Sequence, residues 1–171
     1  PKKSWSYSPA CRDRENRLWV GSISGLDLFR ILNNGNRLER IENPLENRLE
    51  KVSVFHIIED FPGKFWLGTL RGLIRLDLVN GKKFEWYTHN PNNPETLNHN
   101  VITSIFPDRQ GTYWISTWGG GLNILDPQKM KFKRYRYRPG TPDSLSSSLV
   151  YSIFQDQGGT VWAGTWDSGL N

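Results

Sequence analysis

Residues 108–118 read DRQGTYWISTW, and residues 156–166 read DQGGTVWAGTW. The second stretch follows the first by 48 residues, and weaker copies begin at Asp13 and Asp60. In each copy, a residue suited to positive φ follows the aspartate by three positions and tryptophan follows it by six. The repeated pairs are Asp13 and Trp19, Asp60 and Trp66, Asp108 and Trp114, and Asp156 and Trp162. A fixed period of this length decides the fold class.

The period extends beyond this motif. Residues 94–97 (PETL) return as residues 142–145 (PDSL), and Phe84 and Tyr87 return as Phe132 and Tyr135. Within the third copy, turn residues separate four β-rich segments, at 101–106, 112–117, 121–125 and 131–137. This pattern predicts an all-β fold, a β-propeller with four-stranded antiparallel blades and a repeat of about 48 residues. Helical repeats would need a 3.6-residue apolar period, which the sequence lacks.

The predicted propeller occupies residues 1–171 and is partial. We expect blades at about residues 5–41, 52–87 and 100–137, followed by an incomplete blade at 148–171. The length corresponds to about 3.6 periods, an incomplete arc beside rings of about 4–8 blades. The sequence begins at Pro1, and we expect it to be part of a larger protein whose remaining blades are its partners.

The positive charge of the chain comes from one segment. Lysine and arginine number 22 against 17 aspartates and glutamates, a net charge of +5. Six of the basic residues lie in 129–138, and without them the net charge becomes −1. Interleaved aromatic residues there could form a nucleic-acid strip. An outer strand whose charges prevent edge pairing explains the same pattern, so we predict no nucleic-acid partner.

The sequence also limits metal, disulfide and membrane chemistry. Cys11 is the single cysteine, which excludes an internal disulfide and a multi-cysteine zinc site. We interpret His99 as a solvated loop residue and predict no metal site and no cofactor. No apolar run approaches the ~18 residues of a membrane helix, so we expect this segment to make no membrane contact.

The motif as a whole is Asp-x-x-Gly-x-x-Trp-(apolar)-Gly-Thr-x-x-Gly-Gly-Leu, with Phe-x-x-Tyr, Pro-Asp-x-Leu and Val-x-Ser-Ile between its copies. It resembles the two-component regulator propeller repeat. The resemblance covers residues 7–171. The first copy departs most, with Asn16 in place of the glycine and Ser24-Gly25 in place of Gly-Gly.

This resemblance implies a sensor region. In the family, arrays of the repeat form propellers in the periplasmic part of membrane receptors. Many of these are hybrid histidine kinases that respond to breakdown products of complex glycans, and others carry a diguanylate cyclase output. By the same resemblance, we expect an extracytoplasmic location and a homodimer in the parent receptor. Residues 1–171 contain no histidine-kinase box, nucleotide-binding motif or receiver aspartate.

The repeated aspartates and tryptophans could suggest a catalytic or metal site. Recurrence in every copy favours a structural role, because an active site requires asymmetry. We therefore predict that each aspartate caps its own β-turn and that each tryptophan packs between blades.

Trp118 and Trp166 are better candidates for ligand contact. They occupy the turn after the second strand, where the other copies have Leu70 and Ile23. In a meander blade, this turn and the segment leading into the first strand emerge at the same end. That segment carries amide, imidazole and hydroxyl groups, on Asn98, His99, Asn100, Ser146, Ser147 and Ser148. Aromatic plates beside such groups suit an oligosaccharide. The alternative is that both tryptophans only shield neighbouring blades.

These observations support a non-enzymatic ligand-sensing or interaction propeller, the extracytoplasmic input portion of a two-component sensor that responds to glycans. One alternative is a propeller hydrolase or lyase acting on glycans. A glycosidase would need two carboxylates about 5–9 Å apart, whereas the inner strands carry mostly apolar residues, Ser, Thr or His56. Another alternative is a purely structural scaffold for dimerisation.

Overall fold

The computed structural model of the chain describes residues 9–43, 45, 49, 51–80 and 83–171. The predicted start of the first blade, at residue 5, lies outside these residues. The chain forms two compact units. The first unit extends to Leu70 and includes Ile74–Glu85, and the second comprises Arg71–Leu73 and Trp86–Asn171.

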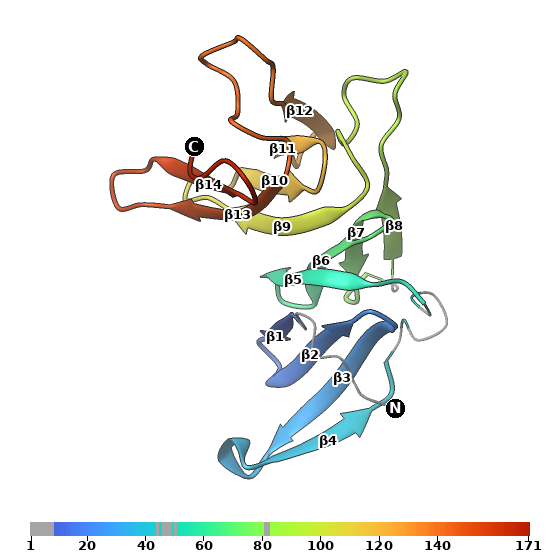
Figure 1. Cartoon of the computed structure of the whole chain (residues 1–171). Helices are drawn as coiled ribbons and strands as arrows, with labels where there is room; N and C mark the ends of the chain where they lie inside the picture. The colour runs from blue at the N-terminus through green and yellow to red at the C-terminus, as the bar shows by residue number, and fades with distance from the viewer. Residues whose placement is uncertain (1–8, 44, 46–48, 50, 81–82) are drawn as a thin grey trace, which may run out of the picture. The chain divides into compact units, whose positions relative to one another are not determined.

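Blades one and two begin the chain (Figure 1). Blade one pairs its strands in the order β1(Ala10–Arg12), β2(Arg17–Ser22), β3(Gly25–Leu32) and β4(Arg37–Ile41), with a short 3-10 turn at Asn33–Gly35. Blade two has the order β5(Val54–Phe61), β6(Lys64–Thr69), β7(Gly72–Asp77) and β8(Lys83–Tyr87). Each strand therefore pairs with its neighbour in sequence, as in a meander.

Blades three and four follow in the second unit. Blade three contains β9(Ile102–Pro107), β10(Tyr113–Thr117), β11(Gly121–Asp126) and β12(Lys131–Tyr135), again in sequence order. Blade four contains β13(Val150–Gln155) and β14(Val161–Thr165), and Asn171 exchanges backbone hydrogen bonds with Ala163 of β14. These antiparallel meanders confirm the predicted all-β propeller fold.

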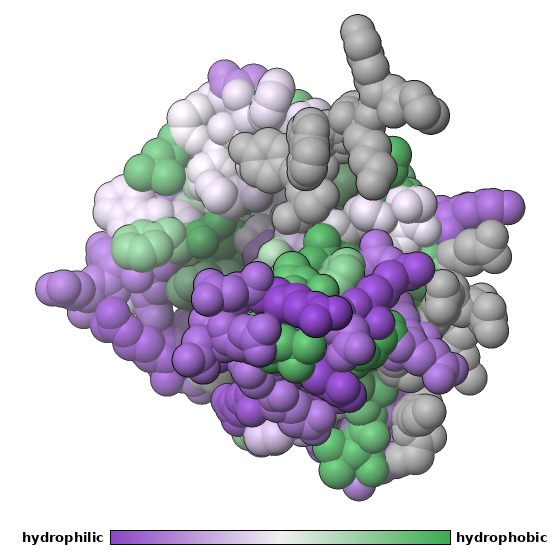
Figure 2. Space-filling view, turned by 90° about the horizontal axis from the view of Figure 1, so that it is seen from below, coloured by the Kyte–Doolittle hydropathy of each residue, from purple (hydrophilic) through white to green (hydrophobic). Residues whose placement is uncertain are grey.

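Burial follows the position of a strand within its blade. In β6, every residue from Phe65 to Thr69 is buried, whereas Arg37–Arg40 of the outer strand β4 are exposed. Apolar side chains also reach the surface, among them Phe61 and Val79. On the face seen in Figure 2, green hydrophobic patches lie among purple hydrophilic residues. The middle strands therefore supply the core, and the outer strands supply the charged surface.

One carboxylate organises the turn between the first two strands in blades one, three and four. One oxygen of Asp13, Asp108 or Asp156 accepts the backbone N–H four residues later, at 2.8, 2.8 and 3.0 Å. The other oxygen accepts the indole N–H of Trp19, Trp114 or Trp162, at 2.8 Å in each case. The aspartate caps its turn, as the sequence predicts. It also joins that turn to the second strand of the blade, which the sequence does not predict.

Blade two departs from this arrangement. The structure gives Asp60 no such bond within the described part of the chain, so its predicted turn-capping role is wrong. Pro62 stands two residues after Asp60 and has no N–H to donate. Phe61 pairs directly with Lys64, which makes a tighter hairpin, with Gly63 at φ 72°. The proline therefore replaces the capped turn.

Within each unit, one side chain connects the turns of two neighbouring blades. The two side chains, Glu59 and Gln155, stand two repeats apart in the sequence. The carboxylate of Glu59 accepts the backbone N–H of Arg14, at 2.8 Å, and that of Gly63, at 2.9 Å. The amide of Gln155 accepts the backbone N–H of Arg109, at 3.1 Å, and donates to the Gly159 carbonyl, at 3.0 Å. The sequence motif does not indicate this link.

The four repeated tryptophans differ in burial, and the prediction of core packing holds only in part. Trp19 is 0% exposed and packs on Phe65 of blade two, with ring centroids 4.9 Å apart. Trp66 is also buried, and Trp114 is half-buried. Trp162 is 38% exposed, which corrects the prediction for blade four.

This difference predicts unequal costs of truncation. Trp19→Ala removes a fully buried ring and should lower the free energy of unfolding by about 3–5 kcal/mol. Trp162→Ala removes less buried area and should cost less than about half of that. Urea denaturation of the two variants measures both values. Equal losses would contradict the burial difference.

Acid should weaken blade one through Asp13. Burial favours its neutral form, but hydrogen bonds from Trp19 and Arg17 outweigh this effect and lower the pKa of Asp13. A lowered pKa contributes stability above the unfolded-state value, near 3.9, and this contribution is lost as the pH falls through the folded-state value. The free energy of unfolding should therefore decrease below about pH 4.

Urea denaturation between about pH 7 and pH 3 tests this prediction. Asp13→Asn should lower stability at neutral pH and reduce its dependence on acid. Asp60→Asn serves as the matched control and should change the acid dependence less, because Asp60 makes no corresponding bond. The same acid dependence in Asp13→Asn as in the parent chain would contradict the assignment.

Candidate functional site

Three aromatic rings gather at one place in the second unit. The Trp118 and Trp166 rings meet edge to face, with centroids 5.5 Å apart and an interplanar angle of 65°. The Tyr151 ring lies 6.3 Å from Trp118 and 5.9 Å from Trp166. Trp166 is 66% exposed, and the other two side chains are half-buried. We refer to Trp118, Tyr151 and Trp166 as the aromatic cluster.

Backbone hydrogen bonds fix both tryptophans in equivalent positions. The N–H of Trp118 donates to the Val101 carbonyl and that of Trp166 to the Leu149 carbonyl, each at 2.9 Å. Trp118 also forms an antiparallel bridge with Leu149 of blade four. The two tryptophans thus belong to consecutive blades and are brought together by the segment leading into β13.

Sequence analysis did not identify Tyr151. It lies on β13, and the residues at its position in the preceding copies are Thr103 and Phe55. The position is aromatic in Phe55 and Tyr151 but not in Thr103, so the repeat does not distinguish Tyr151 as a partner of the two tryptophans. A signal would have required knowing which face of β13 lies toward the turn of blade three.

Glycines keep the turn after β10 close to the neighbouring segments. The backbone N–H groups of Gly119 and Gly121 donate to the Ser148 carbonyl, at 3.1 and 2.9 Å. A Cβ on Gly120 would lie 2.6 Å from the Asn98 side-chain oxygen, closer than real contacts allow. A larger residue at Gly120 would therefore displace the turn that carries Trp118.

His99 lies beside this turn and is half-buried. Its ring approaches Gly119, where a Cβ would lie 3.6 Å from Nε2. Its Nδ1 accepts the backbone N–H of Val101, at 3.2 Å. Burial, followed by the charge of His89, lowers the pKa of His99. His99 is therefore neutral at pH 7, and its Nε2–H is the ring donor.

Other residues that the sequence predicts as ligand contacts instead make hydrogen bonds within the chain. Asn98 is 4% exposed, and its amide is paired on both sides. Its oxygen accepts from Thr117 and Asn123, and its nitrogen donates to the carbonyls of Gly120 and Leu122. This pairing removes Asn98 from the set of groups that a ligand can reach.

Asn100 and Ser147 also contact the chain itself. The Asn100 side-chain oxygen accepts the backbone N–H of His89, at 2.6 Å. Ser147 is buried, and its hydroxyl accepts the backbone N–H of Leu149, at 3.0 Å. Ser148 is half-buried and remains beside the turn through its carbonyl. The structure therefore brings together Trp118, Trp166, His99 and Ser148, and gives backbone-holding contacts to Asn98, Asn100 and Ser147.

Several charges of the basic segment have partners. Lys131 pairs with Glu95 at 2.7 Å, Lys129 lies 3.6 Å from Asp126, and Lys133 lies over the Tyr135 ring. Within the described ranges, no group of three or more His, Cys, Asp or Glu side chains is placed to hold a metal ion. The same ranges contain no helix with the length and apolar character needed to cross a membrane.

Two segments of the chain match a known protein family. Residues 96–119 and 144–167 match the two component regulator propeller family, and both segments include a tryptophan of the aromatic cluster. Both segments are therefore similar to the two-component regulator propeller repeat. They cover the segments leading into β9 and β13 and the hairpins that follow, as the sequence motif predicts. No curated protein sequence matches the chain.

Solved structures share the fold. The chain resembles the extracellular domain of the hybrid two component system BT3049 from B. thetaiotaomicron, with TM-score 0.71 and 21% identity over 98% of this chain and 23% of that chain. The values for BT4673 from the same organism are 0.71 and 22%, over 99% and 24%. Virginiamycin B lyase from Staphylococcus aureus gives 0.55 and 11%, over 95% and 53%. The chain thus spans about a quarter of the two extracellular domains.

The pairing of Asn98 predicts a stability role. Asn98→Ala removes the acceptor of one N–H of the buried Asn123 amide, while the Thr117 hydroxyl keeps the Gly121 carbonyl. One unpaired buried group should cost about 1–3 kcal/mol. Ser146 stands one period later and is exposed, so Ser146→Ala should cost less. Thermal unfolding of both variants measures the difference. A similar decrease in the two melting temperatures would contradict the structural role of Asn98.

Proposed function

We propose that the chain is a ligand-sensing part of the extracytoplasmic portion of a two-component sensor, and that it binds an oligosaccharide at the aromatic cluster. The observation that carries the proposal is the cluster itself, which joins two consecutive repeats through Trp118, Tyr151 and Trp166. The match of both repeats to the two component regulator propeller family supports the sensor assignment.

The chemistry of the cluster suits a sugar ring. The exposed indole of Trp166 offers a flat apolar face to the C–H groups of a pyranose. The neutral His99 supplies a ring N–H, and the Ser148 hydroxyl and Tyr151 phenol supply donors and acceptors. None of these side chains carries a formal charge at pH 7. We therefore propose a neutral oligosaccharide as the ligand.

The remaining features of the proposal concern the parent protein. The segment is non-enzymatic and lies outside the cytoplasm. The remaining blades of the parent chain complete the propeller, and the parent receptor acts as a homodimer. It contacts neither nucleic acid nor membrane. The ion pair of Lys131 with Glu95 supports the first exclusion, because it occupies part of the basic segment.

A competing proposal is a glycan hydrolase or lyase. Virginiamycin B lyase has the same fold, so the fold alone leaves this alternative open. Incubating the chain with the oligosaccharide it binds, and following product release by chromatography, separates the two. Turnover would favour the enzyme, and unchanged oligosaccharide would favour the sensor.

Binding should depend on both tryptophans. We expect tryptophan fluorescence to change when the chain is titrated with a panel of cello-, xylo- and manno-oligosaccharides. Trp118→Ala and Trp166→Ala should each weaken binding by about 1–3 kcal/mol, or about 5- to 150-fold in Kd, because each removes one aromatic contact. Isothermal titration calorimetry measures the change.

Phe154→Ala is the matched control. Phe154 is an exposed aromatic residue of β13 outside the cluster, and its removal should leave Kd unchanged. Normal binding by the double variant Trp118→Ala/Trp166→Ala would refute the cluster as the sugar site. The dimerisation scaffold would then remain as the explanation.

A further inference from the structure

Two loops of the second unit share one conformation. They are residues 90–96, which precede blade three, and residues 138–144, which precede blade four; Figure 1 shows them in yellow-green and orange. In the first loop, the Thr96 hydroxyl accepts the Asn90 N–H at 2.9 Å and donates to the Asn90 carbonyl at 3.2 Å. In the second, the Ser144 hydroxyl makes both bonds to Arg138 at 3.1 Å.

The backbone turns of the two loops also correspond. Asn93 N–H donates to the Asn90 carbonyl, and Thr96 N–H to the Asn93 carbonyl. One period later, Thr141 N–H donates to Arg138, and Ser144 N–H to Thr141. Parallel bridges close both loops, His89 with Leu97 and Tyr137 with Leu145. The same set of oxygen acceptors is therefore built twice.

In the 90–96 loop, these acceptors hold the guanidinium of Arg134. Nε donates to the Thr96 carbonyl at 2.7 Å. Nη2 donates to the Asn93 carbonyl at 2.7 Å and to the Asn90 carbonyl at 3.2 Å. Nη2 also reaches the Thr96 hydroxyl, at 2.7 Å. A planar fork of donors satisfies this geometry, which the single ammonium of a lysine cannot reproduce.

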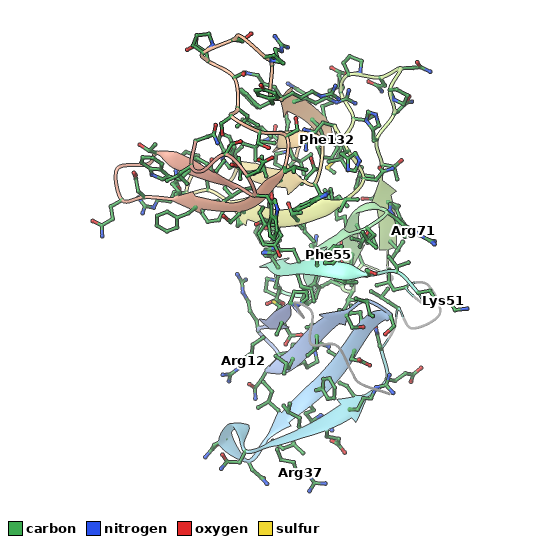
Figure 3. The ribbon with its side chains drawn as sticks, viewed as in Figure 1. Arg12, Arg37, Lys51, Phe55, Arg71 and Phe132 are labelled. Carbon is green, nitrogen blue, oxygen red and sulfur yellow. The ribbon has the colours of Figure 1, made fainter. Side chains whose placement is uncertain are left out.

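Two neighbours of Arg134 complete the contact. Lys131 pairs with the Glu95 carboxylate at 2.7 Å, and the Phe132 N–H donates to the Glu95 carbonyl at 2.9 Å. Phe132, labelled in Figure 3, is buried and packs against Tyr87. The loop thus recognises an extended strand that carries lysine three residues before arginine.

The 138–144 loop offers the corresponding surface. Asp143 stands where the first loop has Glu95, and it lines a hollow of about 430 Å³ together with Arg138, Thr141 and Ser144. Arg134 and Arg136 also line this hollow. The first loop binds the Arg134 guanidinium, so the Asp143 carboxylate offsets the positive charge of Arg136 and Arg138. Within the described part of the chain, no basic side chain donates to these loop oxygens.

We propose that residues 138–144 form a receptor for an arginine side chain, presented on an extended strand that has lysine three residues earlier. The occupant is the outer strand of the blade that this loop leads into, in the relation that β12, the outer strand of blade three, has to the 90–96 loop. The arginine binds the Arg138 and Thr141 carbonyls and Ser144, and the lysine pairs with Asp143. This proposal does not depend on the oligosaccharide site, whose residues are different.

A peptide with the sequence of residues 131–137, KFKRYRY, is the probe. Titrated into the full chain, it should shift the backbone NMR signals of residues 138–144. Replacing its first arginine by lysine should weaken binding at least about 10-fold, the loss of one charge-assisted hydrogen-bond set. Equal binding of the two peptides would overturn the proposal.

Protein variants locate the site. Asp143→Asn should weaken peptide binding and leave the fold intact, because Asp143 makes none of the internal loop bonds. Glu95→Gln in the first loop is the matched control and should bind the peptide normally, since Arg134 already fills that loop. Unchanged binding by Asp143→Asn would overturn the proposal, as would stronger binding of a sulfated oligosaccharide than of the peptide at this hollow.

Discussion

A carboxylate shared between a turn and an indole underlies three of the four blades. One oxygen of the aspartate closes the turn and the other binds the tryptophan of the middle strand, so neither can move without the other. A slip of one residue in strand register would carry the indole to the opposite face of the sheet. The carboxylate therefore fixes the register of the second strand, with which the first and third strands of the blade pair.

Much of this fold could be predicted because the spacing of residues within the repeat indicates where the strands and turns lie. The spacing from aspartate to tryptophan predicts the hairpin, and the period predicts four strands per blade. Blade two shows the limit of that reasoning. Pro62 was visible in the sequence, and its missing N–H accounts for the tighter hairpin. The burial of each indole could not be predicted from the repeat. It depends on a side chain of the neighbouring blade, as Phe65 covers Trp19.

The candidate site likewise contains residues that the sequence predicts and residues that it does not. Trp118 and Trp166 could be found because they interrupt the repeat, and an interruption is what a local function requires. Asn98 has a polar side chain that suits a ligand equally well, and only its hydrogen bonds to the Gly120 and Leu122 carbonyls show that it holds the backbone. Tyr151 gave no signal, because the repeat does not say which residues of adjacent blades meet. The sequence thus shows the type of each side chain, but it does not show which side chains of neighbouring blades contact each other.

The contact between Arg134 and the 90–96 loop bears on how such arrays grow. Both partners lie within residues 90–137, one full period, whereas the sheet of blade three occupies only Ile102–Tyr135. A gene duplication that copied the sheet alone would separate the arginine from its loop and leave the donors of its guanidinium without these acceptors. A duplication that copied residues 90–137 would carry the pair together. The segment that must be copied together therefore begins before the first strand of the blade. Recombination within 97–101 would separate the 90–96 loop from Arg134.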